Sequence, residues 1–197
     1  MFHTVLIANR GEIAVRAIRT LKRLGIRSVA IYSDADRNAE HVQLADAAIA
    51  LGGEKPADTY LRIDKIVAAC KEAGAQAVFP GYGFLSESTE FGKVCEDNGI
   101  VFIGPTSVQI EEFGLKHRAR ELAAAAGVPM TPGTGLLASA AEALREAERI
   151  GYPVMLKTTA GGGGIGLTRC NGADELTRAY ESVQRLGEQF FRDGGVF

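Results

Sequence analysis

Tryptophan is absent from this chain of 197 residues, and cysteine, methionine and histidine occur only three times each. Cys70, Cys95 and Cys170 are odd in number, far apart and without C-x-x-C spacing, so they do not form a disulfide framework. We interpret them as reduced packing residues of a cytoplasmic protein. His3 and His41 have no partner at the spacing of metal ligands, and we therefore expect no metal site within this chain.

Long apolar runs and a surplus of positive charge are also missing. No run approaches the roughly 20 residues that a membrane-spanning helix needs, and the apolar stretch near the first residue is too short for a signal peptide. The chain has 22 Lys and Arg against 24 Asp and Glu, which gives a net charge of −2. Because nothing here favours binding to a phosphate backbone or a bilayer, we expect neither nucleic acid nor membrane as a partner.

Glycine, in contrast, is abundant, with 24 glycines against six prolines. The glycines have no G-x-y period, which excludes a collagen-like chain, and the hydrophobic share of 46% is too high for a disordered one. The length predicts one large domain or one and a half ordinary domains, which is enough for a core without disulfides or metals.

Strand-like and helix-like patterns alternate through the first half of the chain. An apolar run at 4–8, a helical periodicity that stops at Gly25 and a second apolar run at 26–32 have the length of a strand–helix–strand unit. Further strands are predicted at 47–51, 76–79 and 100–103, and further helices at 63–73 and 91–98. This order predicts an α/β domain with a mostly parallel sheet.

Glycine and proline interrupt the second half at 127–135, and this composition predicts a domain boundary near that segment. Beyond it, Ser139 and Glu142 have the spacing of a helix capping box. Residues 194–197 are typical of a turn that enters a strand. The helices expected here cover 107–113, 116–126, 139–150 and a stretch from 171 or 174 to about 190, and the strands cover 152–158 and 167–170.

Five glycines occupy six consecutive positions, in the order Gly161-Gly162-Gly163-Gly164-Ile165-Gly166. The residues that follow predict a strand, whereas a dinucleotide fingerprint needs a helix there, and no Lys-Ser/Thr pair follows as in a P-loop. A glycine-rich hairpin between two strands fits better, because its backbone can bend over a nucleoside triphosphate and present N–H groups to anionic oxygens. A flexible linker is the alternative.

Two lysines are candidates for contact with a phosphate. Lys157 ends the strand before the glycine loop, where its point charge can meet a phosphate group, although it can equally be a surface lysine at a strand end. Lys116 lies between two predicted helices. Periodicity alone favours an exposed helix lysine at this position.

Two further patterns have both a functional and a structural interpretation. Tyr82 and Gly83 follow a predicted strand, at the edge where open α/β sheets bind ligands, but a tight turn with a packing tyrosine also fits. Arg16, Arg19 and Arg23 form a basic stripe on the first helix. A solvated face is the default interpretation of such a stripe, and a subunit contact is the alternative.

Taken together, these residues resemble the N-terminal part of biotin carboxylase, the ATP-grasp component of biotin-dependent carboxylases. The matching stretches, in the family's order, are LIANRGEIA at 6–14, PGYGFLSE at 80–87, FIGP at 102–105, and YPV at 152–154 with Lys157 and the glycine loop. The resemblance implies a Rossmann-like pre-ATP-grasp domain with a parallel sheet at residues 1–113. It further implies the first, incomplete part of an ATP-grasp α+β domain at 114–197, which includes the glycine-rich flap.

Within this family the chain looks most like urea carboxylase, which is also found fused in urea amidolyase. FGLKH at 113–117 stands where acyl-CoA and pyruvate carboxylases usually have a Met-Gly-Asp-Lys pattern, and Ile165 stands where they usually have a basic residue. Phe79 departs from the histidine that commonly precedes Pro80. The alternatives are a carboxylase of the acyl-CoA or pyruvate type, another ATP-grasp ligase, and a non-catalytic truncated module used for association.

The resemblance also implies roles for the candidate residues. Lys116 and Lys157 would contact the phosphates of ATP, and the flap Gly161–Gly166 would close over them. Tyr82 and Gly83 would lie near the ureido ring of biotin. The arginine stripe would lie in the region through which biotin carboxylases form homodimers.

The implied reaction activates bicarbonate with ATP and Mg²⁺ as carboxyphosphate, which then carboxylates biotin. Biotin would be attached to a separate carrier domain, and a carboxyltransferase domain of the same enzyme would pass the carboxyl group to urea to give allophanate. The family's catalytic residues and magnesium-binding carboxylates are expected beyond residue 197. We therefore expect this chain, taken alone, to be inactive.

Overall fold

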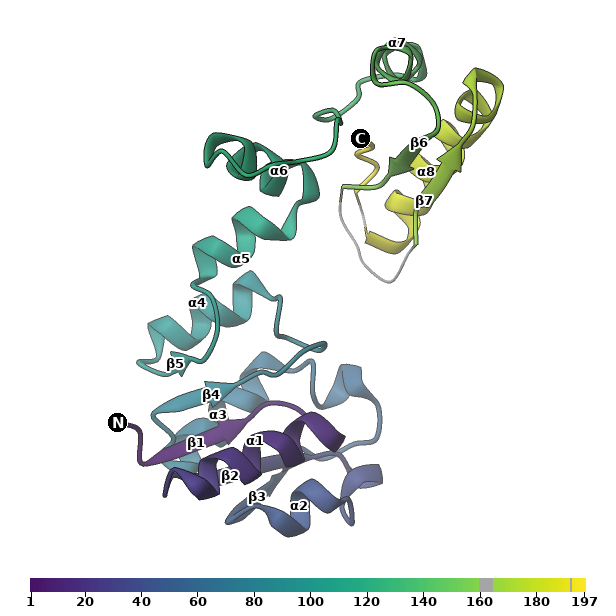
Figure 1. The fold of residues 1–197 in the computed structure, drawn as a ribbon. Coiled ribbons are helices and arrows are strands. Elements are labelled where there is room, and N and C mark those ends of the chain that lie inside the picture. Colours follow the sequence, from purple (N-terminus) through teal and green to yellow (C-terminus); the bar gives the residue numbers. More distant parts are fainter. Residues whose placement is uncertain (160–164, 192) are drawn as a thin grey trace. The chain divides into compact units, whose positions relative to one another are not determined.

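Five parallel strands form one sheet in the computed structural model, which describes residues 1–159, 165–191 and 193–197 (Figure 1). Their spatial order is β3-β2-β1-β4-β5. The strands are β1 (Thr4–Ile7), β2 (Arg27–Tyr32), β3 (Ala47–Ala50), β4 (Ala77–Phe79) and β5 (Val101–Phe102). The predicted parallel α/β sheet is confirmed. Because the chain builds the sheet first to one side of β1 and then to the other, the carboxyl ends of β1 and β4 form a topological switch point.

A helix follows each of these strands, and the periodicity predicts all of these helices except the second. They are α1 (Gly11–Arg23), α2 (Glu40–Leu44), α3 (Ile63–Ala73), α4 (Thr89–Asp97) and α5 (Ser107–Gly114), with short 3-10 turns at Asp34–Asp36 and Pro56–Asp58. Gly25 follows the end of α1 with a left-handed φ of 68°, which confirms the predicted glycine stop. The sequence pattern does not predict α2, whose five residues are too few to show an apolar period.

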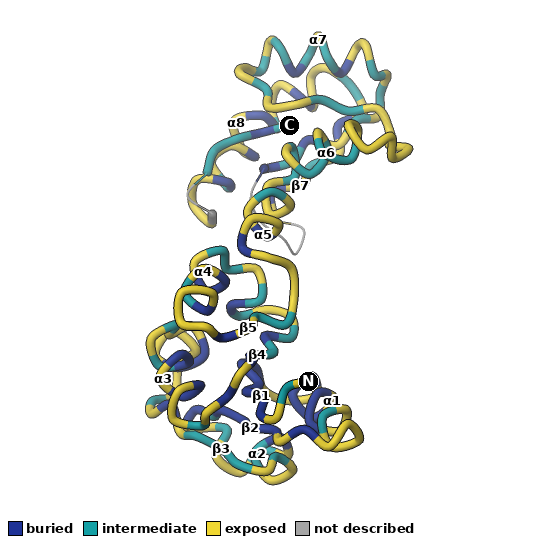
Figure 2. The backbone as a smooth tube through the Cα atoms, turned by 90° about the vertical axis from the view of Figure 1, so that its left-hand side faces the viewer, coloured by how far each residue is buried: buried dark blue, intermediate teal, exposed yellow. Residues whose placement is uncertain are grey.

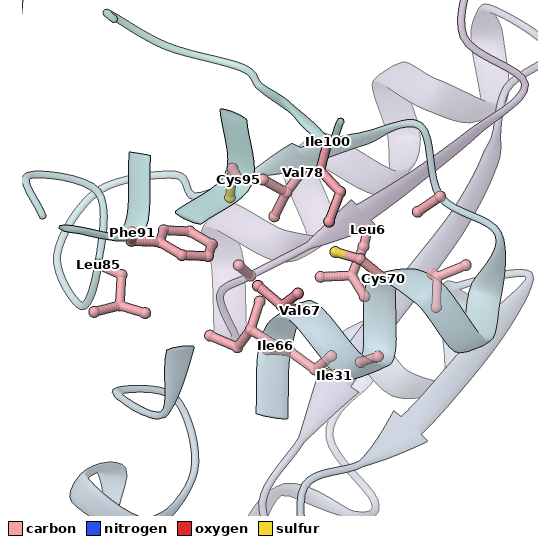
Figure 3. Packing of buried hydrophobic residues seen from close by; sticks show 14 of the residues in the cluster. Leu6, Ile31, Ile66, Val67, Cys70, Val78, Leu85, Phe91, Cys95 and Ile100 are labelled. Atoms are coloured by element: carbon pink, nitrogen blue, oxygen red, sulfur yellow. The ribbon is translucent and has the colours of Figure 1, made fainter. Parts of the chain in front are cut away.

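Alternate residues of each strand face two different cores. Leu6 and Val78 pack with residues of α3 and α4, whereas the adjacent Val5 and Ile7 lie on the face that α1 covers. Both faces of the central strands β1, β2 and β4 are thus mostly buried, and β1 and β2 are largely dark blue in Figure 2. The larger core includes the residues labelled in Figure 3, namely Leu6, Ile31, Ile66, Val67, Cys70, Val78, Leu85, Phe91, Cys95 and Ile100.

The three cysteines are buried and unbridged. Burial raises the pKa of both Cys70 and Cys95 to about 12, so that neither supplies a thiolate near neutral pH. Their interpretation as reduced packing residues is confirmed.

The second part of the chain contains the antiparallel pair β6 (Val154–Lys157) and β7 (Leu167–Cys170) and the helices α6 (Lys116–Ala125), α7 (Ala140–Ile150) and α8 (Ala173–Phe191). Helices α7 and α8 contribute to one core with β6 and β7. The Ser139 hydroxyl accepts a hydrogen bond from the Glu142 N–H, so the predicted cap of α7 is confirmed. Val196 pairs with Thr158 beside the end of β6, which confirms the predicted extended segment at 194–197.

The chain divides into two structural units, Met1–Glu111 and Glu112–Phe197. The segment 127–135 lies inside the second unit, so the domain boundary that its composition predicts is wrong. Its glycines and prolines mark a loop between α6 and α7.

Among the helices of the described residues, none combines the length and the apolar character needed to cross a membrane.

Candidate functional site

The carboxyl ends of β1 and β4 are tied together by the side chain of Asn9. Its amide, in a residue only 4% exposed, donates hydrogen bonds to the carbonyl oxygens of Pro80 (2.7 Å) and Tyr82 (2.8 Å). Between them, Gly81 has a φ of 68°, and a Cβ there would lie 2.9 Å from the Asn9 amide nitrogen. Asn9 therefore fixes the backbone of the β4–α4 loop at the switch point of the sheet.

Tyr82 projects from this loop with 61% of its surface exposed. Its hydroxyl donates a hydrogen bond to the carboxylate of Glu12, in the first turn of α1. Gly83 follows with a φ of 71° and open space around the position of a Cβ. The alternative of a packing tyrosine is wrong because the ring lies at the surface, where it can contact a ligand.

The buried Tyr60 packs against the β4–α4 loop. Phe84 has a φ of 43°, the only left-handed φ of a non-glycine residue in the described part of the chain. Its ring stacks on Tyr60 with a centroid distance of 4.9 Å. The Tyr60 hydroxyl accepts a hydrogen bond from the Ser33 N–H (2.9 Å) and donates one to Asp36 (2.6 Å). Burial and the bond to Asp36 raise the pKa of Tyr60 to about 12.

Asp36 also contacts the β1–α1 turn, because its carboxylate forms an ion pair of 3.5 Å with Arg10. Burial by itself would raise the pKa of Asp36, but the hydroxyls of Tyr60 and Ser33 and the charge of Arg10 outweigh it, so the pKa is lowered. The carboxylate is therefore ionised at neutral pH. Asn9, Arg10 and Glu12, all at the β1–α1 turn, thus contact the β4–α4 loop directly or through Asp36 and Tyr60.

The second unit brings the two candidate lysines together. Lys157 ends β6, and Lys116 begins α6, where its backbone N–H donates to the carbonyl oxygen of Thr159 (3.3 Å). Burial and the positive charge of Lys157 lower the pKa of Lys116. The prediction of an exposed helix lysine at 116 is wrong, because Lys116 is half-buried against the residues that follow β6. Two neighbouring cations favour a bound anion.

Both lysines lie beside the base of the glycine loop. Gly161, Gly162, Gly163 and Gly164 lie outside the described residues. Gly166 has a φ of 74°, and a Cβ there would lie 2.5 Å from the methyl group of Thr158. The Thr158 N–H donates to the Gly166 carbonyl (3.1 Å), and β6 and β7 pair on either side of the loop. The predicted hairpin between two strands is confirmed.

The arginine stripe lies on the exposed side of α1. Arg16, Arg19 and Arg23 line a groove of about 750 Å³ together with Glu40 and His41 of α2. Arg19 forms an exposed ion pair of 3.3 Å with Glu40. This placement is compatible with both a solvated face and a subunit contact.

Within the described ranges, no cluster of three or more His, Cys, Asp or Glu is suited to a metal ion.

Sequence reasoning missed most of the residues that hold these groups in place. Tyr60, Thr159 and Asp193 carry no local signal, because each forms a side-chain hydrogen bond with a residue distant in the sequence. Asn9 stands in a stretch that the resemblance singles out, but nothing in that stretch indicates its bonds to the β4–α4 loop.

Comparison with known families decides the relationship. Residues 1–110 match the biotin carboxylase N-terminal domain, and residues 116–197 match the ATP binding domain of the carbamoyl-phosphate synthase L chain. This chain belongs to the biotin carboxylase family. The resemblance found in the sequence, with its Rossmann-like first domain and the start of an ATP-grasp domain, is confirmed.

Relatives of this biotin carboxylase chain include a urea amidolyase of Lachancea kluyveri, 57% identical over 196 residues, which are 100% of this chain and 11% of that protein. The structure of the present chain is similar to that of the biotin carboxylase domain dimer of Hydrogenobacter thermophilus 2-oxoglutarate carboxylase in complex with MgADP, ADP and bicarbonate. The TM-score is 0.93 at 48% identity, over 100% of this chain and 43% of that chain. A biotin carboxylase–beta-gamma-ATP complex from Campylobacter jejuni gives a TM-score of 0.95 at 43% identity, over 100% of this chain and 44% of that chain. The chain thus spans less than half the length of these relatives.

Proposed function

We propose that this chain supplies the pre-ATP-grasp domain and the phosphate-binding subdomain of an ATP-dependent biotin carboxylase. The observation that carries the proposal is the approach of Lys116 to Lys157 beside the base of the glycine loop. Burial and the positive charge of Lys157 lower the pKa of Lys116, and a bound anion would stabilise the two neighbouring cations. We place the domain boundary between residues 113 and 114, which leaves α5 almost whole in the first domain.

In this proposal Lys116 and Lys157 bind the phosphates of ATP, and Gly161, Gly162, Gly163, Gly164 and Gly166 cover them. Positive charge in a site that excludes water stabilises the charge of a phosphoryl group in transfer. Mg²⁺ bound with the nucleotide would neutralise further phosphate charge. The phosphoryl group passes from ATP to bicarbonate to give carboxyphosphate, the donor for the carboxylation of biotin.

Tyr82 and Gly83 provide the proposed contact with the biotin ring. They lie at the switch point of the sheet, and the aromatic ring is exposed while its hydroxyl is oriented by Glu12. An exposed phenol and an adjacent glycine offer both a flat surface and close approach to the backbone. The biotinyl carrier and carboxyltransferase domains of the whole enzyme are the proposed partners.

We propose urea as the carboxyl acceptor, with allophanate as the product. This is supported by the 57% identity to a urea amidolyase, against 48% and 43% to the two carboxylases compared above. A carboxylase of the acyl-CoA or pyruvate type is the alternative. The test is ATP cleavage by the complete enzyme with urea, acetyl-CoA or pyruvate added. Stimulation by urea alone supports the proposal, and stimulation only by another acceptor contradicts it.

We also propose that α1 contributes to a homodimer, since the H. thermophilus biotin carboxylase domain is described as a dimer. Arg16, Arg19 and Arg23 are exposed and available for such a contact. Light scattering after size exclusion should give a dimer for the native chain and a monomer for Arg16→Glu/Arg19→Glu. A dimer that lacks all affinity for ATP would instead favour a non-catalytic association module.

The 197 residues by themselves should not carboxylate biotin, because they span less than half of the biotin carboxylases with which they align. The measurement is ATP cleavage that depends on free biotin and bicarbonate. Turnover comparable to that of a full-length carboxylase would refute this statement.

A further inference from the structure

Thr159 forms a junction where β6 ends and the glycine loop begins. The residue is 1% exposed. Its carbonyl oxygen accepts a hydrogen bond from the Lys116 N–H (3.3 Å), and its own N–H donates to the carbonyl of Gly195 (2.9 Å). Its hydroxyl donates to the carboxylate of Asp193 (2.7 Å). The main chain and side chain of one threonine therefore connect the start of α6 with the segment after α8.

Asp193 completes this junction. Its second carboxylate oxygen accepts a hydrogen bond from the Gly195 N–H (2.8 Å). The bonds from Thr159 and Gly195, together with the nearby His117, hold the pKa of Asp193 below its usual value despite partial burial. Hydrogen bonds to an ionised acceptor are stronger than those between neutral groups. A Cβ on Gly195 would lie 2.7 Å from the Thr159 methyl group, so the two segments approach each other closely.

We propose that Thr159 and Asp193 are positioning residues that hold Lys116 beside Lys157 and thereby set the affinity of this site for the phosphates of a nucleotide. The inference rests on the proposed binding of ATP and adds two residues outside the family-derived site. Like charges repel, so two ammonium groups stay close only if the backbone that carries them is fixed. The carbonyl of Thr159 fixes the first residue of α6. Thr159 itself cannot shift without loss of its bonds to Asp193 and Gly195.

The first test measures the position of Lys116 without any nucleotide. NMR titration of the lysine side chains in the 197-residue chain should show the lowered pKa of Lys116. Thr159→Val and Asp193→Ala should return that pKa toward the ordinary value of 10.5, because the ammonium group moves away from Lys157 and into water. Thr159→Ser keeps the hydroxyl and should keep the native pKa. An unchanged pKa of Lys116 in folded Thr159→Val and Asp193→Ala would overturn the proposal.

Matched controls come from the first turns of α8. The Thr177 hydroxyl bonds to the Ala173 carbonyl within that helix, and Asp174 is an exposed residue of its first turn. Thr177→Val and Asp174→Ala should leave the pKa of Lys116 as it is in the native chain. If Asp193→Ala does not fold, Asp193→Asn keeps the shape of the side chain while removing its charge and one acceptor. A native pKa of Lys116 in folded Asp193→Asn would then count against the proposal.

The second test compares two nucleotides. Thr159→Val and Asp193→Ala should weaken the binding of ATP about tenfold while the affinity for AMP changes little, because the lysines are proposed to contact phosphates that AMP lacks. An equal loss for both nucleotides indicates a general structural role and contradicts positioning. A native chain that binds no ATP would overturn the proposed function, whereas the lysine titration would still decide whether Thr159 and Asp193 position Lys116.

Discussion

At the scale of single residues, the support of the β4–α4 loop depends on one buried hydroxyl. Tyr60→Phe keeps the ring that stacks on Phe84 but leaves the Ser33 N–H without its acceptor and removes one of the donors to the Asp36 carboxylate. We expect a loss of about 2 kcal/mol in the free energy of unfolding at neutral pH, since one of the lost bonds is to a charged group. Urea denaturation measures this loss. A change below about 0.5 kcal/mol would contradict the network.

The same variant should show a pH dependence of defined sign. The pKa of Asp36 is lowered in the folded chain, so its contribution to stability is present above its unfolded value of 3.8 and is lost as the pH falls through the folded pKa. The difference in stability between the native chain and Tyr60→Phe should therefore shrink below about pH 4. A difference that stays constant down to pH 2.5 would show that Asp36 is not the partner that matters.

The lysine pair makes a second residue-scale prediction. Lys157→Met removes a positive charge beside Lys116 and should raise the pKa of Lys116, since repulsion is one of the two causes that lower it. Lys71→Met, at an exposed position of α3, is the control. NMR titration of the lysine side chains checks this. An equal pKa of Lys116 in the native chain and in Lys157→Met would show that the two groups do not interact.

The local pattern correctly predicted that Lys157 ends a strand, but it failed to predict that Lys116 is half-buried. The position of Lys157 follows from one strand and one loop that are adjacent in the sequence. The position of Lys116 depends on a backbone bond to Thr159, and helical periodicity contains no information about such a tertiary contact. Asp193 is equally invisible to periodicity, because its bond to Thr159 joins residues 34 positions apart.

At the scale of elements, two neighbouring glycines provide a matched comparison. Gly81 and Gly83 have φ values of 68° and 71°, but a Cβ meets Asn9 and Ile13 only at Gly81. Gly83→Ala should cost about 1 kcal/mol for its left-handed backbone. Gly81→Ala should cost at least about 1 kcal/mol more, because the Asn9 amide must shift away from two carbonyl oxygens. Denaturant unfolding measures both, and equal costs would contradict the role given to Asn9.

The strands and longer helices were predictable because burial imposes a period on them. Both faces of the sheet are covered, so β1 and β2 are nearly continuous apolar runs, and α1 buries one stripe. The short α2 and the 3-10 turns lack such a stripe. The segment 127–135 has the composition of a boundary, yet glycine and proline report only that the chain turns there, and the units meet at 111–112.

At the scale of the whole molecule, each structural unit contains its own candidate site. The first unit holds Tyr82 at the switch point of a five-stranded sheet, and the second holds Lys116 and Lys157 at the foot of a two-stranded hairpin. The fold could be predicted because strand and helix patterns alternate along the sequence. The family could be predicted because several motif stretches follow one another in the family's order. The bonds that fix each site could not, because they connect residues through space.

The central claim is that Lys116 and Lys157 form a phosphate-binding site. Its most direct test is a calorimetric titration of the 197-residue chain with MgATP. The native chain and the exposed control Lys71→Ala should bind with the same affinity, and Lys116→Ala/Lys157→Ala should lose at least about tenfold of it. The absence of saturable binding by the native chain, or equal affinities in all three proteins, would contradict the assignment of this hairpin as a phosphate-binding site.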